Sequence, residues 1–114
     1  MTTTALEEAW ALLRQIMIGQ RGRLHAIASE FELAPAQLMA LSSLDPEAPQ
    51  PMSDLARTLR CDNSNVTGIV DRLEARGLVR RRPAEHDRRV KMLEVTPEGA
   101  VLRERIQRRL LEPP

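Results

Sequence analysis

Cysteine, tyrosine and long apolar runs are missing or nearly missing from this 114-residue chain. Its single cysteine cannot form an internal disulfide, so nothing indicates an oxidising compartment. No stretch approaches the ~18–20 consecutive apolar residues of a membrane span. The N-terminal segment has neither a basic start nor an unbroken apolar run, which argues against a signal peptide. We therefore expect a cytoplasmic protein with no membrane partner.

Aromatic side chains are equally scarce, with one Trp, one Phe and no Tyr. Aliphatic residues and alanine must therefore fill the core, which favours helices over a β-sandwich. A chain of this length predicts one domain, or one domain with an arm.

Motifs of known catalytic and metal sites are also absent. The chain has no Gly-rich phosphate loop, no Gly-x-Ser-x-Gly and no His-Glu-x-x-His. Its two histidines, His25 and His86, lie far apart in the sequence, with no cysteine or acidic cluster at metal-ligand spacing. We expect no enzymatic activity, no metal and no cofactor.

Charge is distributed unevenly along the chain, although the formal net charge is only +1. Residues 1–50 hold three cations and six acids, whereas residues 51–114 hold fourteen cations and ten acids. The segment Arg80–Lys91 alone has six cations and two acids. This asymmetry indicates that the second half meets a polyanion; the alternative is a solvated charged surface.

Apolar residues recur at helical spacing from Thr4 to about Phe31. Thr4 is expected to cap this helix, with Glu7 three residues later completing a capping box. The apolar stripe consists of Leu6, Trp10, Leu13, Met17, Leu24, Ile27 and Phe31. It is too long for one small domain to cover, so it predicts pairing with a second chain.

Three short helices are expected in the middle of the chain. Their ranges are 35–44, Ser53–Leu59 and Ser64–Arg76. Ser53 is expected to cap the second helix, Asp62 or Asn63 the third, and Gly77 ends the third. The last two helices are separated by only a few residues, which is typical of a helix-turn-helix.

A β-hairpin and a final helix are expected after these helices. The strands are predicted at Leu78–Arg82 and Arg88–Val95, around a turn at Pro83–Asp87. Thr96 is expected to cap a last helix that ends near Leu111. The order predicts a mainly α fold with a small β-hairpin, a winged helix-turn-helix.

Short polar residues lie just before and within the first turns of the helix expected at Ser64–Arg76. They are Asn63, Ser64, Asn65, Thr67 and Gly68. Such residues allow close backbone approach and can hydrogen-bond base edges and phosphates. Arg72 and Arg76, later on the helix, can reach the DNA backbone. The alternative is a cluster of helix caps, but a cap needs one such residue, so we prefer contact with a major groove.

Cations of the hairpin fall at and just after its expected turn. They are Arg88, Arg89 and Lys91. A hairpin beside a groove-reading helix can lie over the neighbouring minor groove, whose negative potential attracts arginine. Asp87 would hold an arginine guanidinium in a fixed orientation. The alternative is a solvated hairpin with weak surface ion pairs. The density of cations favours DNA.

These motifs together resemble a known family, the MarR-type winged helix-turn-helix regulators of bacteria. The family pattern consists of Asp-Arg-Leu-Glu-x-x-Gly-Leu-Val, a wing Asp-x-Arg and a closing Leu-Thr-x-x-Gly. The matching positions are Asp71–Val79, Asp87 with Arg89, and Val95, Thr96 and Gly99, with Val95 in place of Leu. The resemblance covers about residues 35–111 closely and the first helix loosely.

The resemblance implies a homodimeric transcriptional regulator, usually a repressor, that binds a pseudo-palindromic double-stranded DNA site. The helix at Ser64–Arg76 would lie in the major groove and Arg89 in the minor groove, oriented by Asp87. Relatives often release DNA when a small aromatic or phenolic anion binds between the DNA-binding lobe and the dimerisation helices. Others sense oxidants through a cysteine.

The expected organisation has three parts. Residues 1–32 form an N-terminal dimerisation helix, residues 33–96 the DNA-binding domain, and residues 97–114 a C-terminal dimerisation helix that is short for the family. Dimer contacts are expected at Leu6, Trp10, Leu13 and Met17.

Two other functions remain open. Cys61 could make the protein a redox-sensing regulator, although we prefer a buried structural cysteine. A winged helix could also serve as a protein-interaction module without DNA binding, which would require an exposed apolar patch on the helix at Ser64–Arg76.

Overall fold

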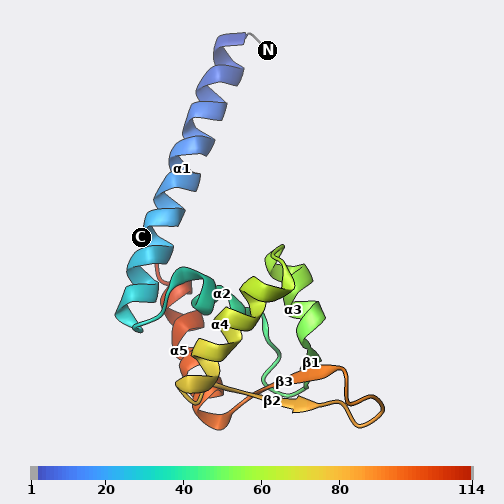
Figure 1. Ribbon diagram of the computed structural model, residues 1–114. Helices are drawn as coiled ribbons and strands as arrows, with labels where there is room; N and C mark the ends of the chain where they lie inside the picture. The colour runs from blue at the N-terminus through green and yellow to red at the C-terminus, as the bar shows by residue number, and fades with distance from the viewer. Residues whose placement is uncertain (1–2, 114) are drawn as a thin grey trace.

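The computed structural model describes residues 3–113 and shows a mainly helical fold with one small sheet (Figure 1). The helices are α1 (Thr3–Glu30), α2 (Pro35–Ser43), α3 (Met52–Leu59), α4 (Asn63–Ala75) and α5 (Pro97–Leu111). The strands are β1 (Gln50–Pro51), β2 (Val79–Pro83) and β3 (Lys91–Val95). The expected fold class, a winged helix-turn-helix with flanking helices, is confirmed.

The sheet has three antiparallel strands in the order β1-β3-β2, so the expected two-stranded hairpin is incomplete. β1 comes from the proline-rich loop before α3, and its Gln50 pairs with Leu93 of β3. Pro51 lacks an N–H, which suits an edge strand of this kind. We call the hairpin from Val79 to Val95 the wing, and its turn, residues 84–90, the wing tip.

The wing tip is longer than the sequence predicted, and the returning strand begins at Lys91 instead of Arg88. The backbone N–H of Val90 donates to the Asp87 carbonyl at 3.1 Å, and the N–H of Ala84 donates to the Val90 carbonyl at 2.9 Å. These bonds close a compact turn, and the strand pairing of the wing begins at Pro83 and Lys91.

Helix caps agree with local sequence signals at two of four places. Asp62 caps α4 and Thr96 caps α5, as expected. The expected cap of α3 is wrong, because the helix begins at Met52 after Pro51, with Ser53 inside it. Thr4 likewise lies inside α1, which already includes Thr3. Gly77 follows α4 with φ of +72°, a left-handed conformation that favours glycine.

The hydrophobic core lies where α2, α4, α5 and the sheet meet the last turns of α1. Fully buried side chains include Ile27 of α1, Leu38 and Leu41 of α2, Val66, Val70 and Leu73 of α4, Leu93 of β3 and Ile106 of α5. Their spacing on α4 gives that helix one inward face. The opposite face of α4 is therefore exposed.

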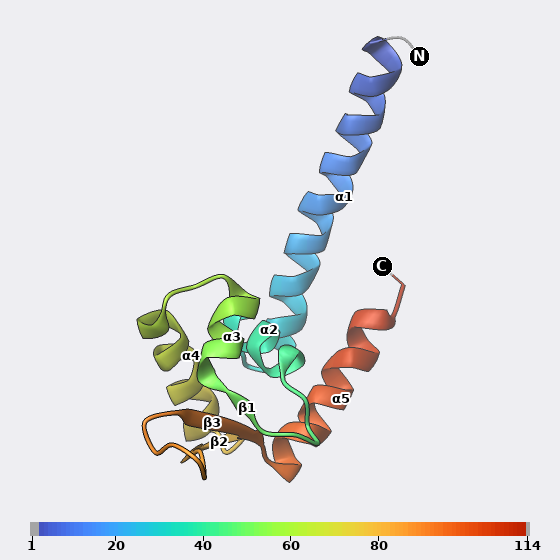
Figure 2. The same ribbon diagram turned by 90° about the vertical axis from the view of Figure 1, so that its right-hand side faces the viewer.

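Most of α1 extends beyond this core as an arm (Figures 1 and 2). Its C-terminal part is tied to the end of α5. Glu30 forms two hydrogen bonds of 2.9 Å with the Arg109 guanidinium, and Arg23 donates to the carbonyls of Arg109 and Glu112. Within residues 3–113, no helix combines the length and apolar character needed to cross a membrane.

Candidate nucleic-acid interface

The outward face of α4 carries small polar residues, as the sequence predicted. Ser64, Thr67 and Gly68 are exposed, and no heavy atom lies within 4 Å of the place where a Cβ would stand at Gly68. Another molecule can therefore approach the backbone closely here. Asn63 begins the helix, but its side chain is outside the described part of the structure.

The start of α4 is held by Asp62. Its carboxylate accepts hydrogen bonds from the Asn65 backbone N–H at 2.9 Å and from the Ser64 hydroxyl at 3.0 Å. These bonds, chiefly the one from the Asn65 N–H, lower the pKa of Asp62. Capping therefore accounts for Asp62 and engages Ser64, whereas it uses only the backbone N–H of Asn65.

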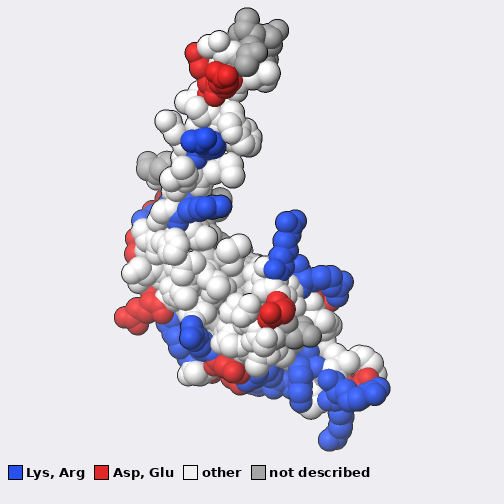
Figure 3. Space-filling view, turned by 45° about the horizontal axis from the view of Figure 1, so that its top comes forward, with Lys and Arg blue, Asp and Glu red and all other residues white. Residues whose placement is uncertain are grey.

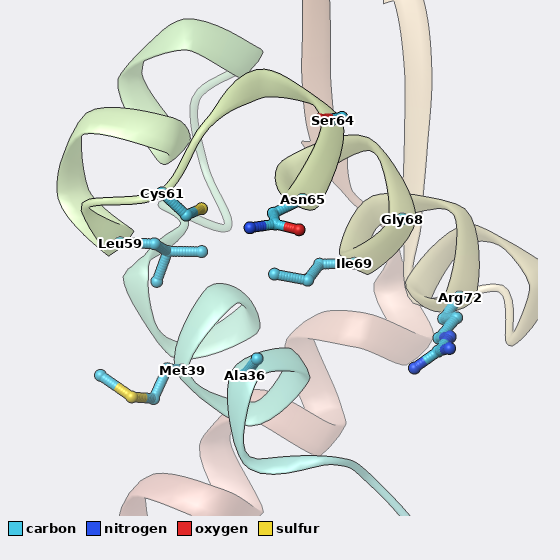
Figure 4. A pocket seen from close by; sticks show the side chains of 9 residues that line it. All are labelled: Ala36, Met39, Leu59, Cys61, Ser64, Asn65, Gly68, Ile69 and Arg72. Carbon is cyan, nitrogen blue, oxygen red and sulfur yellow. The ribbon is translucent and has the colours of Figure 1, made fainter.

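Asn65 and Thr67 lie on different flanks of α4, because two helical residues correspond to a rotation of about 200°. The Asn65 side chain turns toward α2 and lies beside Cys61 and Ile69 (Figure 4). Thr67 faces the wing. It lines a groove of about 350 Å³ together with Arg89 and Lys91. The structure thus brings Thr67, but not Asn65, next to the wing.

The two arginines late on α4 have different environments. Arg72 is exposed and lies at the rim of the cavity beside α2. Arg76 donates to the carbonyls of Phe31 and Glu32, at 3.1 and 2.9 Å. Arg76 was expected to contact DNA, but in this structure it binds the carbonyl groups at the end of α1.

The wing tip places Asp87 and Arg89 as the sequence predicted. The Arg89 side chain is 91% exposed, and its Nε and Nη2 atoms lie 3.2 and 3.3 Å from the two Asp87 carboxylate oxygens. The Arg89 backbone N–H also donates to Asp87, at 3.0 Å. These hydrogen bonds, led by that of the side chain, lower the pKa of Asp87. The carboxylate therefore stays ionised and can orient the guanidinium.

Cations gather over the wing, at the lower right of Figure 3, whereas the arm formed by α1 is mostly uncharged. Arg88 and Lys91 are exposed beside Arg89. The mixture of exposed cations and few acids makes this end of the molecule attractive to a polyanion.

Arg81 connects the wing to α4, and the sequence analysis did not single it out. From β2, its Nη2 atom lies 2.6 Å from Oδ1 of Asp71 and 2.8 Å from Oε1 of Glu74, both on α4. The hydrogen bond with Glu74 raises the pKa of Arg81 and lowers that of Glu74. Two acids three residues apart on a helix that precedes a cationic strand could have indicated this contact.

A cavity of about 500 Å³ lies between α2 and α4 (Figure 4). Its lining residues are Ala36, Met39, Leu59, Cys61, Ser64, Asn65, Gly68, Ile69 and Arg72. The walls are largely apolar, and Arg72 supplies a positive charge at the rim. Cys61 is half-buried at this cavity, so the expectation of a buried cysteine is wrong.

The expected dimerisation stripe divides into two parts. Ile27 is buried, and Leu24 and Phe31 are half-buried against the core. The members nearer the N-terminus of α1 are exposed, including Trp10 at 59% and Leu13 at 45%. Exposed apolar residues outside the stripe were missed: Leu12, Ile16 and Ile18 on α1, and Val101 and Leu111 on α5. The unburied apolar surface is therefore broader than the stripe alone.

Comparison with known proteins identifies the fold and its family. The sequence profile of the MarR family matches residues 33–91, which span α2 to the end of the wing tip. The chain belongs to the MarR family. Its curated relatives in this family are named transcriptional regulators or repressors, not enzymes.

Among these relatives is the transcriptional repressor NicR of Pseudomonas putida, 31% identical over 84% of this chain and 61% of NicR. The repressor MdtR of Bacillus subtilis is 38% identical over 60% of this chain and 44% of MdtR. The chain thus spans between 44% and 61% of the length of these two relatives.

Solved structures of the MarR family superpose over nearly the whole chain. YusO of Bacillus subtilis aligns with a TM-score of 0.76 and 27% identity, covering 96% of this chain and 79% of YusO. A Cys-to-Ser mutant of Escherichia coli MarR, complexed with operator DNA, aligns with a TM-score of 0.73 and 26% identity. That alignment covers 91% of this chain and 76% of the mutant.

Proposed function

We propose that the protein is a transcriptional repressor that binds a pseudo-palindromic double-stranded DNA site as a homodimer. The observation that carries the proposal is the groove in which Thr67 of α4 faces Arg89 and Lys91 of the wing. α4 and the wing lie on the same side of the protein (Figure 2). The short polar side chains of α4 and the cations of the wing can therefore contact one DNA molecule. The MarR-family relatives named as repressors, and the one complexed with operator DNA, support it.

In this mechanism α4 enters the major groove and the wing follows the DNA backbone to the adjacent minor groove. Ser64, Thr67 and the open backbone at Gly68 approach base edges and phosphates. Arg89, held by Asp87, enters the narrow minor groove, where the negative potential is strongest. Arg88 and Lys91 contact phosphates, and so do Asn65 and Arg72 on the other flank of α4.

Dimerisation through the arm supplies the two-fold symmetry. Leu6, Trp10, Leu13 and Met17 leave a continuous apolar face in water on a single chain. A second copy would cover it and set the two α4 helices about 34–36 Å apart, one turn of DNA. Val101 and Leu111 of α5 are exposed as well, and Leu111 lies at the end of α5 that is tied to α1.

Selection of bound duplexes from a random pool tests the proposal. We expect an inverted repeat with half-sites roughly 10 base pairs apart, and affinity that falls steeply with salt because phosphate contacts release counterions. Recovery of no preferred sequence, with affinity equal for all duplexes, would reject sequence-specific regulation.

Replacing Arg89 with alanine should weaken binding to the selected duplex roughly ten- to hundredfold. Within residues 3–113, the Arg89 side chain pairs with Asp87 and is 91% exposed, so folding should be almost unaffected by its removal. Fluorescence anisotropy measures the affinity, and a thermal melt checks folding. Arg80→Ala is the control, since it removes the same charge from the body of the wing; equal losses for both variants would mean that only net charge matters.

We also propose that a small aromatic anion regulates the protein from the cavity between α2 and α4. The apolar walls suit a ring and Arg72 suits a carboxylate, while Asn65 and Gly68 link the cavity to the DNA-binding helix. Benzoate at millimolar concentration should raise the melting temperature by a few degrees and lower the affinity for DNA. Arg72→Ala should remove the melting shift, and acetate should not cause one; a benzoate response that survives Arg72→Ala would place the ligand elsewhere.

A further inference from the structure

A guanidinium group joins the wing to α4 at the base of the proposed DNA groove. Arg81 lies in the middle of β2, opposite Leu93, and only 26% of its side chain is exposed. Its Nη2 atom contacts Asp71 at 2.6 Å and Glu74 at 2.8 Å. Charge-assisted bonds of this length are the strong class of protein hydrogen bonds.

Glu74 also holds the main chain of the wing. Its second carboxylate oxygen accepts the backbone N–H of Arg81 at 3.1 Å. β2 is an edge strand, so an N–H on its outer side has no neighbouring strand to pair with. The carboxylate takes that place, and one residue of α4 therefore fixes both the side chain and the backbone of Arg81.

Among the described residues, the other ion pairs of the wing stay within it. Arg82 pairs with Glu94 at 2.8 Å, and Arg89 pairs with Asp87 at the tip; all four residues belong to the wing. Arg81, Thr67 and Lys91 line one cavity of about 420 Å³, so Arg81 lies next to residues of the proposed interface. It is placed where it can set the separation of the two DNA-contacting elements.

We propose that Arg81 is a positioning residue: bound by Asp71 and Glu74, it holds the wing at a fixed distance and angle from the DNA-reading face of α4. The proposal rests on the proposed function, since it concerns how two DNA contacts are kept in register. A mobile wing would lose conformational entropy when it binds DNA. A wing already fixed relative to α4 avoids this cost. Arg81 thus acts through Arg89 and need not touch DNA.

Direct phosphate binding by Arg81 makes the opposite prediction for its partners. If Arg81 acted as a free cation near DNA, Glu74→Gln would remove a repulsive charge and strengthen binding. If Glu74 positions Arg81, the same change loosens the wing and weakens binding, although the protein becomes more positive. The sign of the effect therefore distinguishes the two roles, and glutamine keeps the size of the side chain.

The experiment measures affinity of the full chain for its selected duplex in a double-mutant cycle of Glu74→Gln and Arg89→Ala. Glu74→Gln should weaken binding about tenfold in the wild-type background, and at most twofold once Arg89 is absent. Glu47→Gln, which removes the same charge from the exposed loop before β1, should leave affinity unchanged. Stronger binding by Glu74→Gln, or an equal loss with and without Arg89, would overturn the proposal.

Hydrogen exchange without DNA provides an independent readout. In Glu74→Gln, amides of residues 79–95 should exchange several-fold faster than in the wild type, while the core of α2 keeps its protection. Uniformly faster exchange would mean general destabilisation, and unchanged exchange would mean that Glu74 does not hold the wing; either result overturns the proposal. A wild type that selects no duplex would reject the proposed function, whatever this exchange experiment shows.

Discussion

Replacing Leu13 with glutamate should convert the proposed dimer into a monomer. Burying a leucine is worth about 2 kcal/mol, and two-fold symmetry places the substitution twice in one interface. The dimer should therefore lose about 4 kcal/mol, roughly a thousandfold in its dissociation constant, before the cost of burying the carboxylate is added. Sedimentation equilibrium over a wide concentration range measures this directly.

The matched control is Gln15→Glu, which adds the same charge about 180° around α1 from the stripe. It should leave the dimer much less affected than Leu13→Glu. Loss of the dimer should also reduce the affinity for the full palindrome far more than for an isolated half-site, because only the dimer engages both half-sites. A wild type that stays monomeric at micromolar concentration and above would defeat the proposed assembly.

Substituting Gly99 with alanine should destabilise the fold by about 3 kcal/mol, near the upper end of the usual cost of overpacking. A Cβ at Gly99 would stand 2.0 Å from the Leu78 carbonyl oxygen and 3.0 Å from Cγ1 of Val95. The Leu78 carbonyl cannot simply turn away, because it accepts the Thr96 N–H at 3.1 Å. Either α5 must move from the sheet or the junction of α4 and β2 must shift.

Urea denaturation followed by circular dichroism measures this loss, which should also lower the melting temperature by more than about 10 °C. Gly22→Ala is the control, since nothing lies within 4 Å of a Cβ there and alanine favours a helix by up to about 1 kcal/mol. A Gly99→Ala protein as stable as the wild type would show that α5 can be displaced without cost. The clash also gives a physical reason for glycine at the end of the Thr-x-x-Gly motif.

Short-range features of this protein could be predicted from its sequence because the interacting groups are neighbours in the chain. Asp62 caps α4 through an N–H three residues later, and Thr96 caps α5 in the same way. Asp87 binds Arg89 two residues away. Apolar spacing likewise determined the inward face of α4. These signals were sufficient for the winged helix-turn-helix and for most of the candidate interface.

Local signals failed where proline or a turn competed with them. Ser53 is a good cap by composition, yet α3 begins one residue earlier, since β1 brings Pro51 to the start of the helix. Residues 88–90 alternate like a strand, yet the bonds of Asp87 close them into the wing tip. In the first case the pairing of β1 decides where the helix begins, and in the second the hydrogen bonds of the turn decide where the strand begins.

Tertiary structure alone decided what the remaining charged groups do. The sequence placed Arg76 on an exposed face, but its partners are carbonyls at the end of α1, more than forty residues away. Arg81 resembled the other cations of its strand until the fold set it against Asp71 and Glu74. A long side chain can reach several partners. Residue spacing along the chain does not predict which of them the packing of α1, α4 and the wing brings within hydrogen-bonding distance.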